Sequence, residues 1–234
     1  MKHLFSAIFL TASLLGAQTA SATDFNVRIT NLSNGIYFTP FLVAAHPEGS
    51  SLFTTGQPAS ANLQAMAEGG DISGLVADLQ GLGATISENP AGGLLAPASE
   101  TDVDLNTDGT SNDRLSIVAM LLPTNDAFAG LNAIMIPTDP GTYVFDVPAY
   151  DAGTEANDEL ITGGGAPGEA GIPADPGGFG GTGGSGASTA VANPNVHFHR
   201  GPLGDLNTTG GTCVLDSSVH RWLNPVIRVF ITFR

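Results

Sequence analysis

The apolar segment Tyr143-Val-Phe-Asp-Val-Pro-Ala-Tyr150 runs directly into Asp151-Ala-Gly-Thr-Glu155, and this junction decides how the chain is interpreted. The first segment is typical of a β-strand, so the two acids follow a strand end. With a glycine between them, Asp151 and Glu155 can turn back toward one point. Clustered carboxylates repel one another unless a cation lies between them. The junction therefore predicts a cation site at the end of a strand.

A second apolar run supplies a third acid. Residues 115–122 are almost wholly apolar, which predicts a strand buried on both faces, and Pro123-Thr-Asn-Asp126 follows. If the two strand ends are neighbours at one rim of a sheet, Asp126, Asp151 and Glu155 converge. Carboxylate ligands without Cys or His favour one Ca²⁺ ion over zinc. The alternative is three solvated loop acids. Two nearby acids are candidates for extra or water-bridged ligands: Asp158 and Glu159.

Several other segments predict strands, some by alternation of apolar and polar residues and others by their apolar content. These segments are Phe25–Asn31, Ile36–Ala45 (interrupted by Pro40), Leu131–Ile136, Val196–His199 and Val226–Phe233. Strands separated by turns, with few helices, predict an all-β fold, a β-sandwich.

Two short helices are expected between these strands. Ala61–Glu68 contains good helix formers and stops at a Gly-Gly pair. Asp71 is a candidate N-cap for a second helix. The apolar stripe of that helix comprises Ile72, Leu75, Val76, Leu79 and Leu82. We expect both helices to cross one end of the sheet.

Two polar or glycine-rich stretches are expected to form loops. Residues 87–113 are rich in Asn, Pro, Gly, Ser and Asp, which favours a loop. Gly163–Ala187 is rich in Gly, Pro, Ser and Ala, so we expect a mobile surface loop that buries little. Strand patterns resume afterwards, which places this Gly-rich loop inside the domain.

The N-terminus has the pattern of a signal peptide over residues 1–22. Lys2 and His3 precede an apolar run, Leu4–Leu15, and Ala20-Ser-Ala22 is a small-residue cleavage site. The run is too short to span a membrane. We therefore expect cleavage after Ala22 and a single exported domain over residues 23–234, periplasmic or extracellular.

The remaining chain is acidic and contains one cysteine. Lys2 is the only lysine, so six arginines face 22 acids after cleavage, a net charge of −16. This charge argues against nucleic acid and anionic membranes as partners and suits cation binding. Solubility alone is the alternative explanation. Cys213 cannot form an intrachain disulfide, and we expect a buried thiol, with pairing between chains as the alternative.

Three weaker patterns have ordinary structural roles as their alternatives. Asp104-x-Asn106-x-Asp108-Gly109 matches half of an EF-hand loop, but a solvated polar turn is favoured because position 115 is Leu. His197-x-His199 places two imidazoles on one face of a strand, where paired rim histidines are favoured over a metal site. No nucleophile or zinc-protease motif is present, so we expect no enzyme activity.

Taken in order along the chain, the motifs resemble the spondin N-terminal domain, in the single-domain form of bacterial exported proteins. The matching segments are Phe25–Thr30, Phe38–His46, Phe53–Ser60, Leu63–Gly70, Leu122–Phe128 and Tyr150–Glu155, and the closing strand fits as well. They cover nearly the whole mature chain.

The resemblance implies a C2-like β-sandwich that carries a divalent cation, usually calcium. In that family the ligands come from the Asp of a Pro-x-x-Asp turn and from both acids of Asp-Ala-Gly-Thr-Asp. Carried over, these are Asp126, Asp151 and Glu155. Two positions depart from the family pattern: Glu155 replaces an Asp, and Ala127 stands where an aromatic residue usually follows.

The expected function is therefore an exported calcium-binding module for cell-surface, matrix or glycan contact. One alternative is a metal-assisted hydrolase that uses the three acids with His197 or His199 as a base. Another treats the ion as purely structural and the Gly-rich loop as the binding part.

Overall fold

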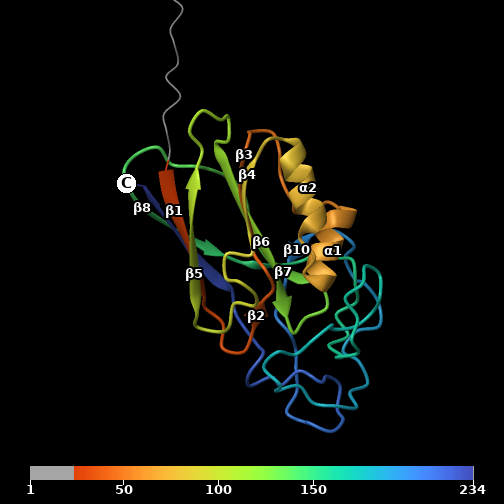
Figure 1. The fold of residues 1–234 in the computed structure, drawn as a ribbon. Coiled ribbons are helices and arrows are strands. Elements are labelled where there is room, and N and C mark those ends of the chain that lie inside the picture. The colour runs from red at the N-terminus through yellow and green to blue at the C-terminus, as the bar shows by residue number, and fades with distance from the viewer. Residues whose placement is uncertain (1–23, 234) are drawn as a thin grey trace, which may run out of the picture.

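The computed structural model describes residues 24–233, so the expected signal peptide lies outside the described residues. Two antiparallel sheets face each other (Figure 1). The smaller sheet has the order β5 (Glu100–Asn106), β1 (Asp24–Asn31), β11 (Ile227–Phe233), β8 (Gly141–Val147). The larger sheet has the order β10 (His197–Phe198), β9 (Ala149–Asp151), β7 (Ala127–Met135), β6 (Arg114–Leu122), β3 (Leu42–His46), β4 (Thr85–Glu88), and β2 (Tyr37–Phe38) also pairs with β6. The predicted all-β sandwich is confirmed.

The segment that ends at Tyr150 is divided between the two sheets. β8 pairs with β11 in the smaller sheet, whereas β9 pairs with β7 in the larger one. Pro148 lies between β8 and β9 and cannot donate a ladder hydrogen bond, which suits a crossing point. This crossing delivers Asp151 to the larger sheet, beside the start of β7.

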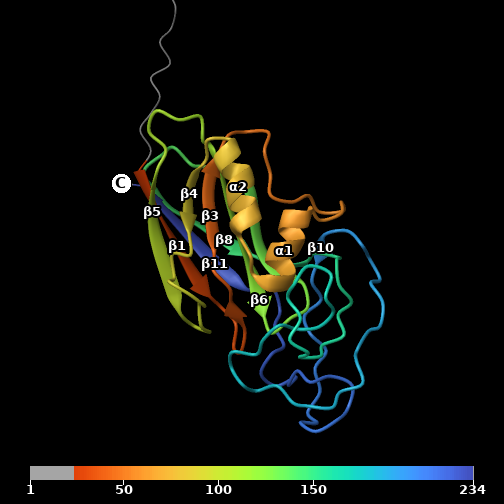
Figure 2. The same ribbon diagram turned by 45° about the vertical axis from the view of Figure 1, so that its right-hand side comes forward.

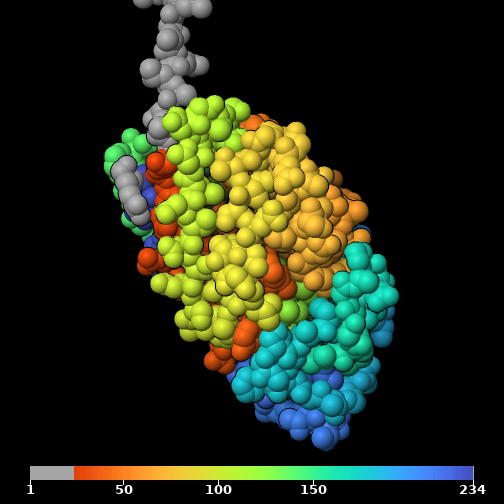
Figure 3. All heavy atoms as spheres, in the orientation of Figure 1, coloured from red at the N-terminus to blue at the C-terminus, as the bar shows by residue number. Residues whose placement is uncertain are grey.

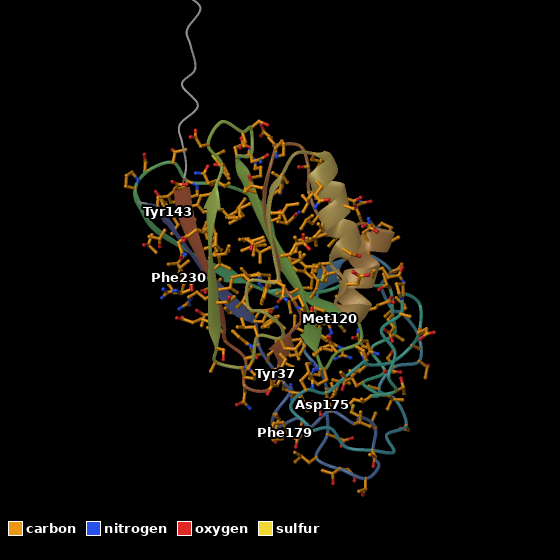
Figure 4. All side chains as sticks on the ribbon, viewed as in Figure 1. Tyr37, Met120, Tyr143, Asp175, Phe179 and Phe230 are labelled. Atoms are coloured by element: carbon orange, nitrogen blue, oxygen red, sulfur yellow. The ribbon has the colours of Figure 1, made fainter. Side chains whose placement is uncertain are left out.

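Strand β6 is buried on both faces, as its sequence predicts. Ile117 and Leu121 belong to the core between the sheets, while Val118 and Met120 belong to a second core on the outer face. Helices α1 (Ala61–Gly69) and α2 (Ser73–Gly81) cover that outer face (Figures 1 and 2), and Met120 lies beside α1 (Figure 4). Each apolar face of β6 therefore has its own covering layer.

The expectation that the helices cross one end of the sheet is wrong. Leu75, Val76 and Leu79 pack in the outer core, because the apolar outer face of the sheet would otherwise meet water. Leu82, at the end of the predicted stripe, is 50% exposed. Asp71 accepts a hydrogen bond from the Ser73 N–H (2.9 Å), but the N-cap position itself is occupied by Ile72.

Helix α1 has a side-chain N-cap that gives a first prediction. The Ser60 hydroxyl accepts a hydrogen bond from the Leu63 N–H (3.1 Å). Ser60→Ala should lower the free energy of unfolding by about 0.5–2 kcal/mol, because it leaves that N–H without its partner. Urea unfolding measures the change, with Ser51→Ala, an exposed serine outside any helix, as the control. Equal midpoints for the two variants would contradict this role for Ser60.

The predicted loop over residues 87–113 is also wrong in part, because β5 lies inside it. Thr101 and Leu105 are buried and Val103 is half-buried, while Asp102 and Asp104 between them are exposed. The period-2 pattern is present, but the acids obscure it. Among the strands of residues 24–233, β5 pairs with β1 alone, and charged outward side chains on such an edge strand oppose pairing with another chain.

Residues 152–226 form a lobe of loops at one end of the sandwich (Figures 1 and 3), and within it only β10 is a strand of more than one residue. Asp175 and Phe179 lie in this lobe (Figure 4). The Gly-rich loop buries more than expected, since Ile172 is completely buried and its N–H bonds to the Leu160 carbonyl (2.8 Å). Glycines allow close backbone packing here in place of side-chain packing.

Cys213 lies in the same lobe and is 1% exposed, which confirms the expected buried thiol. Burial raises the pKa of this thiol to about 12, and the nearby Glu159 carboxylate acts in the same direction. A thiol that stays protonated at neutral pH is a poor nucleophile.

Candidate metal centre

The acids meet where β7 begins and β9 ends. These strands are antiparallel, and Ala127 of β7 lies opposite Asp151 of β9. Asp126, immediately before β7, therefore comes beside the turn that follows Asp151. In the larger sheet β9 lies between β10 and β7, and the apolar strand β6, which precedes the turn at residues 123–126, is one strand further away.

Asp126 is completely buried and holds the Asp151–Glu155 turn in place. Its Oδ2 accepts hydrogen bonds from the N–H groups of Thr154 (2.9 Å) and Glu155 (3.1 Å). Its Oδ1 is buried without a hydrogen-bond partner. A buried carboxylate oxygen without a partner is costly unless a cation or proton occupies its free side.

Glu155 repeats this pattern. Its Oε1 accepts hydrogen bonds from the Asn125 side chain (3.1 Å) and from the Gly171 N–H, and its Oε2 is buried without a partner. Asp151 differs, because both of its oxygens are engaged. Oδ1 accepts from the Gly153 N–H (2.8 Å) and Oδ2 from the Asn157 side chain (2.6 Å).

Burial and mutual repulsion disfavour the charged forms of two of these acids. Burial raises the pKa of Asp126 to about 7, and the charge of Asp151 adds to this, against the N–H bonds from Thr154 and Glu155. Burial likewise raises the pKa of Glu155 to about 7, against the Gly171 and Asn125 hydrogen bonds. A divalent cation would remove this penalty.

As the side chains stand, no group of three His, Cys, Asp or Glu residues within residues 24–233 is arranged to enclose a metal ion. The donor set nevertheless fits a hard cation. The two unpartnered oxygens, Oδ1 of Asp126 and Oε2 of Glu155, belong to neighbouring buried carboxylates, and oxygen-rich sites of this kind suit Ca²⁺.

Both histidines of the His197-x-His199 motif approach the same acid. The Nε2 atoms of His197 and His199 lie 3.8 Å and 3.9 Å from Oδ2 of Asp151. His199 is buried and packs against the Trp222 ring, whereas the His197 side chain is 36% exposed. The sequence shows no third ligand near these two histidines. In the fold, the pairing of β10 with β9 places Asp151 opposite His197 and so brings a carboxylate to the pair.

The other two acidic candidates accept hydrogen bonds of their own, although the charge of Asp158 contributes to the raised pKa of Glu155. Glu159 accepts hydrogen bonds from the N–H groups of Leu203 (2.7 Å) and Gly204 (2.8 Å), so its carboxylate is committed to that loop. Asp158 accepts from the Asn125 side chain (2.8 Å) and from its own turn.

The half EF-hand pattern lies in the other sheet. Asp104 accepts a hydrogen bond from the Asn26 side chain (3.0 Å), and Oδ1 of Asn106 accepts from the Asp108 N–H (2.8 Å). This is the exposed polar turn favoured by the sequence, with Asp104 and Asn106 on the edge strand β5.

Three residues of the centre were missed in the sequence. Asn125 bonds to both Glu155 and Asp158, and Asn157 bonds to both Asp151 and His199. Glu68 of α1 is completely buried, accepts a hydrogen bond from the Gly168 N–H (2.6 Å), and its charge contributes to the raised pKa of Glu155. Asn125 lay in the Pro123–Asp126 turn and Glu68 in the matching segment Leu63–Gly70, but neither was assigned a role there, and Asn157 lay in no motif.

A pocket of about 220 Å³ opens beside Asp151. Its polar and aromatic lining includes Asp151, Glu155, Asn157, His197, Phe198 and Arg200. One side of the acid cluster is therefore accessible to small solutes.

Gly153 gives a second prediction, because it sits in a left-handed conformation (φ +71°) and a Cβ there would lie 2.7 Å from the Asn193 carbonyl oxygen. Gly153→Ala should destabilise the protein by at least about 1 kcal/mol and weaken cation binding, because strain and clash displace the turn. Gly109→Ala is the matched control, with φ +69° and open space around its Cβ. Thermal unfolding with and without calcium checks both variants. An equal loss in both would show that the Asn193 contact is unimportant.

The sequence profile of the family Spondin_N matches residues 18–159, more than half of the 234-residue chain. The chain belongs to the spondin N-terminal domain family. The match contains Asp126, Asp151 and Glu155 and ends at Glu159. It does not extend over the closing strand, where the motifs suggest a further fit. A comparison with curated proteins gives no match.

Membership in the spondin family indicates an extracellular binding module. Within residues 24–233, neither helix of this spondin domain has the length and apolar character needed to cross a bilayer. β10 and the Gly-rich loop lie beyond the family match, so His197 and His199, which approach Asp151, come from outside the matched region.

Proposed function

We propose that this spondin domain is an exported, non-catalytic module that binds one Ca²⁺ ion through Asp126, Asp151 and Glu155 and acts in cell-surface, matrix or glycan binding. The observation that carries the proposal is the pair of buried, unpartnered carboxylate oxygens on Asp126 and Glu155. A buried pair of this kind is stable with a cation between its members and strained without one.

The ion would order the loops that present the binding surface. Glu155 also bonds to Gly171, and Glu68 bonds to Gly168, so acids of the centre hold two points of the Gly-rich loop. A bound ion would reduce the repulsion between Glu155 and the neighbouring acids, and Glu155 could then keep its hydrogen bond to Gly171 in the charged form. Calcium would therefore stabilise the lobe as well as the turn.

Calorimetric titration of calcium into the mature protein tests this proposal. We expect one ion per chain for the wild type and no binding for Asp126→Asn, which keeps the shape of the side chain and removes its charge. Asp104→Asn, in the half EF-hand pattern, is the matched control and should bind calcium like the wild type. Binding that survives Asp126→Asn and disappears in Asp104→Asn would place the ion in β5 and overturn the proposal.

A metal-assisted hydrolase is retained as the alternative function, because both histidines lie within 4 Å of Asp151. It requires a base beside a metal-bound water. Turnover of simple phosphate or carboxylate esters by the metal-loaded protein, abolished by His197→Gln, would favour it over the binding module.

The third hypothesis assigns partner binding to the Gly-rich loop and only a structural role to the ion. A variant with a shortened Ala174–Ala187 segment separates this hypothesis from the proposed function. The change spares Gly168 and Gly171, which bond to the acids of the centre, and cell-surface binding of the variant is compared with that of the full chain. Unchanged binding by the shortened variant would count against the third hypothesis.

A further inference from the structure

The hydrogen bonds of the two histidines assign different tautomers. Nδ1 of His197 lies 2.8 Å from the Asn195 carbonyl oxygen, which can only accept a hydrogen bond. Nδ1 of neutral His197 therefore carries the hydrogen, and Nε2 keeps its lone pair. This is the arrangement of metal-binding histidines, which donate their other ring N–H to a carbonyl or carboxylate.

His199 has the opposite arrangement. Its Nδ1 accepts a hydrogen bond from the Gly201 N–H (2.9 Å), so the hydrogen lies on Nε2, which donates to Oδ1 of Asn157 (3.1 Å). Asn157 in turn donates to Oδ2 of Asp151 (2.6 Å). His199 thus positions the Asp151 carboxylate through Asn157 and has no free lone pair in this tautomer.

The free lone pair of His197 is close enough to share an ion with Asp151. Its Nε2 lies 3.8 Å from Oδ2 of Asp151, and two metal–ligand bonds of about 2.1 Å together span roughly 4.2 Å. Both residues line the 220 Å³ pocket, from which water can complete the coordination shell. No hydrogen bond to Nε2 of His197 competes for the lone pair among the contacts of the described residues.

We propose that His197 supplies a nitrogen ligand, through Nε2, to the ion held by Asp151, and that the centre therefore binds a divalent transition-metal ion such as Mn²⁺ or Zn²⁺ in addition to Ca²⁺. The proposal rests on the proposed function, because it assumes that an ion binds beside Asp151. Imidazole nitrogen favours transition metals, whereas Ca²⁺ selects oxygen. His197 thus sets the metal preference of the site.

The test uses Mn²⁺ bound to the mature protein, with electron spin-echo spectroscopy to detect ¹⁴N coupled directly to the ion. We expect one coupled imidazole in the wild type and none in His197→Gln. Zn²⁺ affinity should fall at least about tenfold in His197→Gln, while calorimetric Ca²⁺ affinity should change much less. His199→Gln tests whether the nitrogen comes from the other histidine, and it should retain the coupled nitrogen because the Gln side-chain N–H can replace the Nε2 donor to Asn157.

The outcomes separate this proposal from the proposed function. A wild-type Mn²⁺ complex without coupled nitrogen, or with coupling that persists in His197→Gln, overturns the nitrogen ligand. If calcium binding dependent on Asp126 is intact in that case, the proposed function stands. If neither Ca²⁺ nor Mn²⁺ binds, both proposals fail. Should His199→Gln fail to fold, His197→Gln decides alone, because its partly exposed side chain can be replaced without opening the core.

Discussion

Asp126→Asn is expected to stabilise the metal-free protein most at pH 8, less at pH 5, and hardly at all below about pH 4. The pKa of Asp126 is raised from its ordinary value of 3.8 to about 7, mainly by burial and then by Asp151. At pH 8 the folded protein must hold this carboxylate ionised among other acids. The Asn side chain removes that charge and still accepts the Thr154 and Glu155 hydrogen bonds. We expect a gain of a few kcal/mol, on the scale of about 1.4 kcal/mol per pKa unit.

The sign follows from proton linkage. Because the folded pKa of Asp126 lies above the unfolded one, the folded state binds more protons between about pH 4 and pH 7, and this residue makes stability fall as the pH rises through that window. His199 opposes the trend, since burial lowers its pKa to about 4 and acidification below about pH 6.5 then favours the unfolded state. Subtracting the variant from the wild type cancels the contribution of His199.

Thermal unfolding of both proteins in chelator across pH 5 to 8 measures this difference, and a repeat in calcium provides the internal control. Calcium should stabilise the wild type at pH 8 by about 2.7 kcal/mol at a hundredfold excess over its dissociation constant, and the variant hardly at all. If Asp126→Asn gains no more stability over the wild type at pH 8 than at pH 5, the ionised carboxylate does not destabilise the folded protein. The metal hypothesis then loses its main support.

Phe128→Ala should have the largest effect on stability, about 3–5 kcal/mol, because it opens a cavity in the outer core. Phe128 is completely buried, stacks on Tyr150 (ring centroids 5.6 Å apart) and meets Phe53 edge-on (5.1 Å). It lies two residues after Asp126, so we also expect weaker calcium binding. Urea unfolding and calcium titration measure the two effects.

Phe198→Ala provides the comparison for this variant. Phe198 also stacks on Tyr150, with ring centroids 5.0 Å apart, but it is 60% exposed. Its removal should therefore lower the free energy of unfolding by less than about 1 kcal/mol. Similar losses for the two variants would mean that the buried Phe128 contributes no more to stability than the exposed Phe198.

Local patterns in the sequence were sufficient where the physical cause is local. The alternation in β1 and β11 and the apolar run of β6 predicted these strands, because side-chain direction has a period of two along any strand. The helix formers of Ala61–Glu68 and the Gly-Gly pair predicted α1 and its end, since helix propensity and the left-handed Gly70 (φ +72°) involve neighbours in sequence. The clustering of acids around the Asp151–Glu155 turn was also local.

Only the tertiary structure decided which of these pieces meet. The crossing at Pro148 sets Asp151 beside β7, and the pairing of β10 with β9 then brings His197 to the same carboxylate from 46 positions away. Glu68 and Gly171 approach Glu155 from a helix and a glycine-rich loop, neither of which indicated a contact with Glu155 in the sequence. The sequence determined the strands and the acids because those depend on periodicity and turn chemistry. The environment of the acids depends on sheet order and on burial, which set desolvation and pKa and arise only when distant segments pack together.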